Sequence, residues 1–193
     1  MPEKFDPSNK EALVSDDRRR HLDIHRVLSL LPIQPYHVVA DVGAGPGYFT
    51  IPLAKYLFDG KVYALDIQQE MLDATKTALE SIRLTNTDLL LSEETKLPLE
   101  KSILDGALMA FVLHEANDRK GLLKDVNRAL SNGGWLAILE WYNKKTEGGP
   151  PVEQRIDEAD MLKMVTAAGF RFTARHEVNK DQYMLILRKQ PKK

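Results

Sequence analysis

A glycine-rich segment carries the strongest chemical signal in the sequence. It is the run DVGAGPGY, residues 41–48, at the end of an apolar stretch, 37–42, that indicates a short buried strand. Glycine adopts positive φ readily and lets a ligand touch the backbone where a Cβ would collide. A helical pattern follows over residues 49–57, and Pro46 suits the entrance of that helix. The segment therefore predicts a loop that holds a ligand against a helix N-terminus.

The spacing of the glycines narrows the kind of ligand. Dinucleotide-binding dehydrogenases use G-x-G-x-x-G at the corresponding turn, whereas the pattern here is G-x-G-x-G. In addition, Asp41 stands two residues before the first glycine, Gly43. Both departures count against a nicotinamide dinucleotide, although an NAD-dependent oxidoreductase stays open as an alternative.

An acidic residue stands where the second strand of an α/β unit would end. Asp66 closes the run KVYALD, residues 61–66, and comes 19 residues after Gly47. A carboxylate at the carboxyl end of that strand can accept hydrogen bonds from both hydroxyls of a ribose. The competing interpretation is a helix cap for the run that begins at Gln68. We favour ribose binding, because Asp66 comes at the separation that the glycine loop predicts.

Strand-like and helix-like runs alternate along the rest of the chain, which is typical of a mostly parallel sheet with helical crossovers. Residues 170–178 and 182–189 are separated by three residues only. Three residues are too few for a helical crossover, so the two runs predict an antiparallel hairpin at one sheet edge. Together the patterns predict an α/β fold in a single domain over 1–193.

The N-terminal region differs from the core that follows it. Ser15 and the acidic residues after it predict the start of one helix over residues 16–31. Within that helix the charge run RRR, residues 18–20, indicates a solvated face. We therefore divide the predicted domain into an N-terminal helical cover, 1–35, and a ligand-binding core, 36–193.

Composition excludes several classes of function. Lys and Arg number 27 against 28 Asp and Glu, so no overall field would attract nucleic acid or an anionic membrane. The chain has no cysteine, which excludes disulfides and thiolate chemistry, and we expect no metal site. The longest nearly apolar stretch, 103–113, is shorter than the roughly 20 residues that span a bilayer. With no signal-peptide pattern, the protein is predicted to be cytoplasmic, without a membrane span or a nucleic-acid partner.

The ordered motifs resemble the class I S-adenosylmethionine-dependent methyltransferases, in particular the small-molecule branch that includes the ubiquinone and menaquinone biosynthesis methyltransferases. The likeness extends from Val38 to Phe170. It rests on five segments in order: VVADVGAGPGYFT, VYALDIQQEML, SEETKLPLEKSILDGALMAFVLHE, LSNGGWLAILEW and LKMVTAAGF. The resemblance implies a Rossmann-like, mostly parallel seven-stranded sheet with helices on both faces and the C-terminal antiparallel hairpin. It also implies S-adenosyl-L-methionine as the cofactor.

Carried over residue by residue, the resemblance assigns the cofactor contacts. The cofactor-binding residues that it implies are Asp41, Gly43, Ala44, Gly45, Gly47, Asp66, Ile67 and Glu93. The small residues of the loop would line the methionine and ribose portions, and Asp41 would fix the loop. Asp66 would bind the ribose hydroxyls, and Ile67 would lie against the adenine. Glu93 would face the adenine amino group, with the adjacent Glu94 as the alternative.

A histidine after the predicted fourth strand is the candidate catalytic base. Methyl transfer from a sulfonium disperses positive charge, so alignment of donor and acceptor supplies most of the catalysis, and a base is needed only where the acceptor loses a proton. His114 has a pKa range that suits proton abstraction. Two interpretations stay open beside it: His114 supports the pocket, or Glu115 and Glu140, with Trp141 and Tyr142, face the acceptor instead.

Absent motifs narrow the methyl acceptor. No N-P-P-Y or D-P-P-Y segment, which holds a flipped base in amino-directed nucleic-acid methyltransferases, follows the fourth strand. We therefore predict a small-molecule methyl acceptor, with its nucleophile left open. The short cover and the loop over 143–155 predict an open pocket, or one that a second subunit of a homo-oligomer completes. A non-catalytic module that keeps the cofactor pocket is the remaining alternative.

Overall fold

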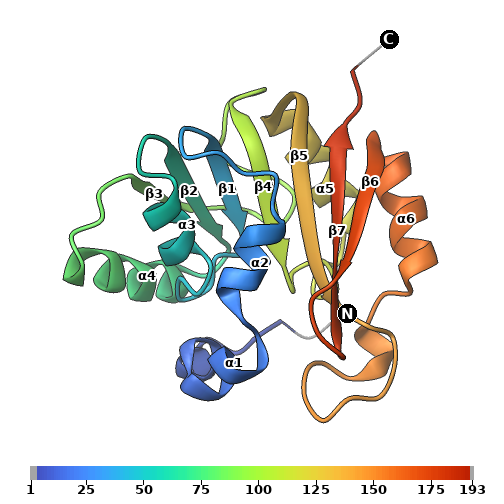
Figure 1. Ribbon diagram of the computed structural model, residues 1–193, viewed down its shortest axis with the longest axis horizontal. Helices are drawn as coiled ribbons and strands as arrows, with labels where there is room; N and C mark the ends of the chain where they lie inside the picture. Colours follow the sequence, from blue (N-terminus) through green and yellow to red (C-terminus); the bar gives the residue numbers. More distant parts are fainter. Residues whose placement is uncertain (1–3, 192–193) are drawn as a thin grey trace.

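The centre of the computed structural model is one seven-stranded sheet, drawn in Figure 1. The structure describes residues 4–191, so residues 1–3 and 192–193 of the predicted domain lie outside the described residues. The strands lie in the order β3-β2-β1-β4-β5-β7-β6. In chain order they are β1 (Val38–Val42), β2 (Lys61–Asp66), β3 (Thr87–Leu91), β4 (Leu104–Ala110), β5 (Leu130–Trp141), β6 (Phe170–Glu177) and β7 (Gln182–Lys189).

Six strands run in one direction, and β7 runs against them. β1 pairs in parallel with β2 and β4, and further parallel pairs join β2 to β3 and β4 to β5. β7 is antiparallel to both β5 and β6. The predicted mostly parallel sheet and the hairpin at its edge are therefore confirmed. The last strand, β7, lies between β5 and β6, an order that the sequence pattern did not predict.

The strand order reverses between β1 and β4. From β1 the chain moves outward through β2 to β3, and it then returns to place β4 on the other side of β1. The loops after β1 and β4 therefore diverge at the carboxyl edge of the sheet. Ligands of open α/β sheets bind at such a switch point, so the topology places the candidate site beside the glycine loop.

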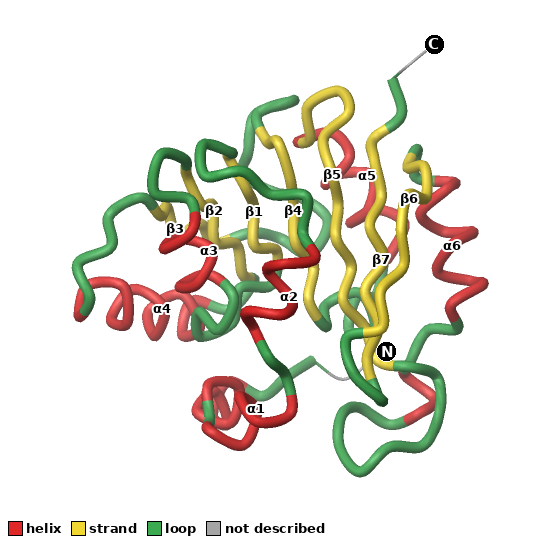
Figure 2. The backbone as a smooth tube through the Cα atoms, in the orientation of Figure 1, coloured by secondary structure: helices red, strands yellow, loops and turns green. Residues whose placement is uncertain are grey.

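Helices cover both faces of the sheet, as predicted (Figure 2). They are α2 (Ile24–Leu30), α3 (Thr50–Tyr56), α4 (Gln69–Ser81), α5 (Arg119–Ala129) and α6 (Glu158–Ala167). Alternate residues of each strand point to opposite faces, so in β4 Met109 belongs to one buried cluster and Leu108 to the other. The first cluster includes side chains of α5 and α6, and the second includes side chains of α2, α3 and α4. Within residues 4–191, no helix has the length and apolarity to cross a bilayer.

The N-terminal region departs from the single helix that the sequence predicts. It forms a 3-10 turn, η1 (Pro7–Val14), and two short helices, α1 (Asp16–His21) and α2. Ser15 caps α1, as predicted. The helix breaks because Leu22 is extended and the carboxylate of Asp23 caps α2 by accepting hydrogen bonds from two backbone amides. As a result, the region bends over the carboxyl edge of the sheet and contributes to the wall of a cavity there.

Candidate functional site

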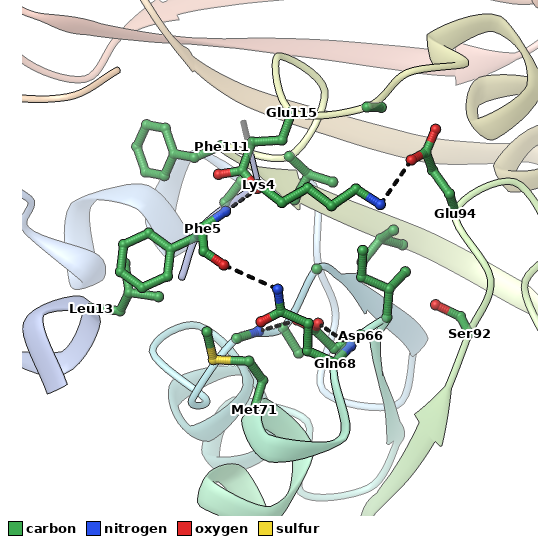
Figure 3. Close-up of a pocket in the computed structure, with 18 of the residues that line it drawn as sticks. Lys4, Phe5, Leu13, Asp66, Gln68, Met71, Ser92, Glu94, Phe111 and Glu115 are labelled. Atoms are coloured by element: carbon green, nitrogen blue, oxygen red, sulfur yellow. Dashed lines mark hydrogen bonds and ion pairs between the residues drawn. The ribbon is translucent and has the colours of Figure 1, made fainter. Parts of the chain in front are cut away.

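The candidate site is a cavity at the carboxyl edge of the sheet, beside the switch point. It has a volume of about 1010 Å³, with the space at its open mouth included, and Figure 3 shows side chains around it. The loops that follow β1, β2, β3 and β4 form its walls, and the N-terminal region closes one side. Six of the residues predicted to bind a cofactor line it: Gly43, Ala44, Gly45, Asp66, Ile67 and Glu93.

Backbone conformation explains the glycines of the loop. Gly43, Gly45 and Gly47 have φ values of +73°, +54° and +90°, a region that glycine enters at little cost. The amide of Gly43 donates to the carbonyl of Leu65 at 2.8 Å, which ties the loop to the end of β2. A Cβ at position 43 would overlap Cγ2 of Val112. The loop is therefore held between β2 and the segment after β4.

The helix after the loop begins later than the sequence predicts. Pro46 lies in the turn rather than at the helix entrance, because α3 starts at Thr50. Thr75 of α4 also holds the loop, because its hydroxyl donates to the carbonyl of Gly45 at 2.8 Å. No sequence pattern singled out Thr75, since its partner lies 30 residues away in the chain.

Asp41 and Gly47 lie outside the cavity wall that the other predicted cofactor residues form. The carboxylate of Asp41 is buried and accepts a hydrogen bond from the hydroxyl of Thr50 at 2.6 Å. Burial raises the pKa of Asp41 to about 7, against the opposing effect of that hydrogen bond. A Cβ on Gly47 would lie 3.1 Å from the side chain of Thr75. Both residues contact the elements that support the loop, and their part in cofactor binding stays a prediction.

We expect the unfolding free energy to fall with rising pH because of Asp41. Its carboxyl has an unperturbed pKa of 3.8, whereas burial raises the pKa to about 7 in the fold. Between these values the unfolded chain has released the proton and the folded chain keeps it. The contribution of Asp41 therefore falls by about 1.4 kcal/mol per pH unit and is lost once the pH exceeds the folded pKa.

Asp41→Asn is the matched variant, because it cannot ionise and keeps an acceptor for Thr50. Between about pH 4.5 and pH 7.5, the unfolding free energy of the wild type should fall steadily relative to that of Asp41→Asn. Urea denaturation at each pH measures both values. Parallel curves for the two proteins would contradict the raised pKa.

Asp66 joins the glycine loop to the start of α4. Its Oδ2 accepts a hydrogen bond from the amide of Gly45 at 2.8 Å, and its Oδ1 accepts one from the amide of Gln68 at 3.0 Å. Burial raises the pKa of Asp66, and these amide hydrogen bonds oppose the shift. Each carboxylate oxygen can accept a second hydrogen bond, so both can still receive ribose hydroxyls. The contact with the start of α4 and the predicted ribose contact are therefore compatible.

Two neighbouring carboxylates after β3 differ in what they bind. Glu94 accepts hydrogen bonds from two backbone amides after β4, both at 2.9 Å, and pairs with Lys4 at 3.1 Å. The carboxylate of Glu93 lies 3.7 Å from Lys96 and is largely exposed. Nearby, Ile67 leaves 38% of its surface exposed. Of the two carboxylates, Glu93 is the one more available to a ligand, and Ile67 offers apolar surface for a ring to cover.

A short N-terminal strap, residues Lys4 and Phe5, crosses the cavity and is bound on three sides (Figure 3). The amide of Phe5 donates to the carboxylate of Glu115 at 3.3 Å, and its carbonyl accepts from the side chain of Gln68 at 3.0 Å. Lys4 pairs with Glu94 on the third side. The strap links the segments after β2, β3 and β4, although the sequence predicted only a helical cover here.

Comparison with known proteins decides the family. A sequence model described as a methyltransferase domain matches residues 40–138, half of the chain. The chain belongs to the methyltransferase domain family. This match confirms the family resemblance drawn from the ordered motifs.

Individual relatives agree with this assignment. The chain is 31% identical to the demethylmenaquinone methyltransferase of Bacillus mycoides over 114 residues. This alignment covers 58% of this chain and 48% of that protein. The chain thus spans about half the length of the curated relatives that it matches. It is also similar to a SAM-dependent methyltransferase from Aquifex aeolicus, with 32% identity, a TM-score of 0.92 and coverage of 96% of this chain and 99% of that chain.

A further solved structure shares the fold alone. The [4+2]-cyclase SpnF is 16% identical, with a TM-score of 0.76 and coverage of 86% of this chain and 79% of that chain. The predicted Rossmann-like fold is confirmed by these structures. Because one fold hosts different reactions, the reaction must be argued from the site.

In the methyltransferase domain, His114 lies behind the cavity wall, whereas Glu115 lines it. The imidazole is buried, with Nδ1 2.9 Å from Oε2 of Glu140 and Nε2 3.8 Å from Oε1 of Glu115. Burial lowers the pKa of His114, but the hydrogen bond to Glu140 and the two carboxylate charges outweigh it, so the net shift is upward. The other residues considered for the acceptor side, Glu140, Trp141 and Tyr142, lie outside the lining of the cavity.

Glu115 is the member of this buried row that reaches the cavity. Burial raises the pKa of Glu115, and the charge of His114 opposes that shift. A carboxyl with a raised pKa is a stronger base than an exposed one. The row Glu140, His114 and Glu115 therefore ends at the cavity in a carboxylate suited to accept a proton.

Arg18 is the site residue that the sequence analysis misplaced. The charge run predicted a solvated face, and the side chains of Arg19 and Arg20 are indeed 65% and 71% exposed, but Arg18 lines the cavity. In the helix that the sequence predicts, Arg18 precedes the buried Leu22 by four residues, so the two would share one side. Arg19 precedes Leu22 by three residues, so helical spacing alone does not separate Arg18 from Arg19.

Proposed function

We propose that this chain transfers the methyl group of S-adenosyl-L-methionine to a small organic acceptor. The observation that carries the proposal is the cavity at the switch point, where the glycine loop and Asp66 meet in a chain of the methyltransferase domain family. When bound, the cofactor supplies an electrophilic methyl group on a sulfonium. The task of the chain is to bind it, align the acceptor and exclude water.

The residues of the cavity fit this cofactor. The loop at 43–45 lines the cavity and carries only the methyl group of Ala44 as a side chain, so a ligand can approach its backbone closely. We assign the loop to the methionine and ribose portions and Asp66 to the ribose hydroxyls. Ile67 and Glu93, with exposed apolar surface and an available carboxylate, are assigned to the adenine.

For acceptors that lose a proton, we propose Glu115 as the catalytic base and His114 as its positioning residue. Glu115 lines the cavity and His114 does not, which favours the carboxylate over the imidazole as the group that meets the acceptor. The side chain of His114 is held by Glu140 and lies 3.8 Å from Glu115. In this arrangement the histidine lies outside the lining of the cavity, and its charge lowers the pKa of Glu115.

Ligand-induced stabilisation tests the cofactor. S-adenosylhomocysteine at about one hundred times its Kd should add about 2.7 kcal/mol to the unfolding free energy. For a chain of 193 residues this corresponds to a rise in Tm of roughly 5–10 °C. NAD and NADP should leave the Tm unchanged. Stabilisation by NAD and none by S-adenosylhomocysteine would replace the proposal with an oxidoreductase.

Asp66→Ala should weaken the binding of S-adenosylhomocysteine by about 1.5 to 3 kcal/mol, the range for hydrogen bonds to a charged group. Calorimetric titration measures the change. Asp88→Ala is the control, because Asp88 pairs with Lys61 and lies outside the lining of the cavity. Wild-type affinity in Asp66→Ala, at an unchanged Tm, would show that the ribose lies elsewhere.

Quinols and phenols are the acceptors that we propose to test first. The relatives from Bacillus are named demethylmenaquinone methyltransferases, and a quinol offers hydroxyl oxygens and ring carbons as nucleophiles. Formation of S-adenosylhomocysteine across quinols, phenols, amines and thiols measures the activity. Cofactor binding with no turnover on any member of the panel would favour the non-catalytic module.

We further propose a cytoplasmic protein that acts without nucleic acid and forms a homo-oligomer in which a second copy completes the open cavity. The near balance of 27 basic and 28 acidic residues supports the absence of a nucleic-acid partner. Light scattering with and without S-adenosylhomocysteine tests the oligomer, and a monomer under both conditions would contradict it.

A further inference from the structure

The guanidinium of Arg18 lies close to two aromatic rings of the cavity wall. Its Cζ lies 5.0 Å from the ring centroid of Tyr48 and 5.4 Å from that of Phe111. Phe111 lies across the cavity from Asp66 (Figure 3), whereas Tyr48 directly follows the glycine loop. Both rings are themselves held in place. The hydroxyl of Tyr48 donates to the carbonyl of Leu22 at 2.7 Å, and Phe111 packs on Trp141.

The positive charge of Arg18 has no carboxylate partner within residues 4–191. Its two neighbours on α1 differ in this respect, since Arg19 pairs with Asp16 at 3.6 Å and Arg20 pairs with Asp17 at 3.3 Å. The Nε of Arg18 is fully buried and donates no hydrogen bond to any residue that the structure describes. Burial of an unpaired charge is costly, so a ligand that supplies an anion at this place would recover that cost.

The guanidinium of Arg18 contacts two rings, but its Nε has no hydrogen-bond partner within residues 4–191. Rings hold a guanidinium through its faces, whereas its N–H donors point outward in its own plane. The edge that carries these donors matches the two oxygens of a carboxylate in a bidentate pair. Within residues 4–191 no side-chain acceptor uses the edge, and Arg18 lines the cavity.

We propose that Arg18 is the anion-recognition residue of the cavity and pairs with a carboxylate group of a bound ligand. The inference rests on the proposed function, because the ligand is either the cofactor or the methyl acceptor. The carboxylate has two possible sources: the amino-acid end of the cofactor, or an acidic group on the acceptor. In both cases Phe111 and Tyr48 contact the guanidinium.

The test compares Arg18→Gln and Arg18→Met with Arg19→Gln, an exposed neighbour on the same helix. Calorimetric titration uses S-adenosylhomocysteine and its decarboxylated analogue. A second titration, with S-adenosylhomocysteine present, uses 4-hydroxybenzoate and the neutral 4-hydroxybenzyl alcohol. Tm values identify any variant that fails to fold, and Arg18→Met keeps an apolar stem beside the rings. The loss expected for the carboxylate ligand is about 10- to 100-fold, with no loss in Arg19→Gln.

The results separate the two sources. If the cofactor supplies the carboxylate, both Arg18 variants bind S-adenosylhomocysteine more weakly and bind its decarboxylated analogue as the wild type does. If the acceptor supplies it, affinity for S-adenosylhomocysteine is unchanged and only the benzoate loses affinity. Equal binding of every carboxylate by folded variants and wild type overturns the inference. Failure of the proposed function has a different signature, because the wild type itself would then bind no S-adenosylhomocysteine. A wild type that bound neither S-adenosylhomocysteine nor the benzoate would overturn both.

Discussion

Gly43→Ala is expected to abolish measurable cofactor binding and to lower the stability of the fold. Gly43 has a φ of +73°, which alanine adopts at a cost of roughly 1 to 2 kcal/mol. The added Cβ would also overlap Cγ2 of Val112, so the loop or that side chain must shift. Because the backbone of the loop forms part of the cavity, the same movement should weaken S-adenosylhomocysteine binding by more than about 100-fold, as measured by calorimetry.

Three further variants separate the causes. Gly133 has a similar φ of +74° with open space around it, so Gly133→Ala measures the conformational cost alone. Gly148 has neither a positive φ nor a close neighbour, so Gly148→Ala should be neutral. Adding Val112→Ala to Gly43→Ala removes the overlap and should restore part of the affinity. Tight binding by Gly43→Ala would show that the cofactor does not lie along this loop.

Glu115→Gln is expected to lower turnover of a phenolic acceptor by about 100-fold or more, the loss typical of a general base. Cofactor affinity should change little, because Glu115 lies across the cavity from Asp66 (Figure 3). In the wild type, turnover should fall as the pH drops through the pKa of Glu115, which burial raises above its ordinary value of 4.5. This acidic limb should vanish in Glu115→Gln. Glu147→Gln, in an exposed loop, is the control.

His114→Gln distinguishes a positioning residue from a base. The charge of His114 lowers the pKa of Glu115, so its removal should move the acidic limb to higher pH while the limb itself remains. If His114 were the base, the limb would disappear in His114→Gln and persist in Glu115→Gln. The pH dependence of turnover in both variants therefore decides which residue accepts the proton.

Local patterns in the sequence predicted the arrangement of the glycine loop and Asp66 at one edge of the sheet. The glycines and Asp66 occur at the ends of β1 and β2, and parallel strands place their carboxyl ends at one edge of the sheet. The amide of Gly45 accordingly reaches the carboxylate of Asp66 at 2.8 Å. The hairpin was equally predictable, because three residues between two strand-like runs of the sequence are too few for a helical crossover; the strands themselves are four residues apart. Each of these features depends on neighbours in the chain or on strand direction.

Only the tertiary structure decided which side chains of the segment after β4 and of the N-terminal region line the cavity. His114 and Glu115 are adjacent in sequence, yet the loop after β4 turns one toward Glu140 and the other into the cavity. Arg18 carries the same charge as Arg19, but its side chain lies close to two rings from distant segments, those of Tyr48 and Phe111. These outcomes depend on contacts between residues far apart in the chain, and the pattern around a residue does not specify which distant side chains will meet it.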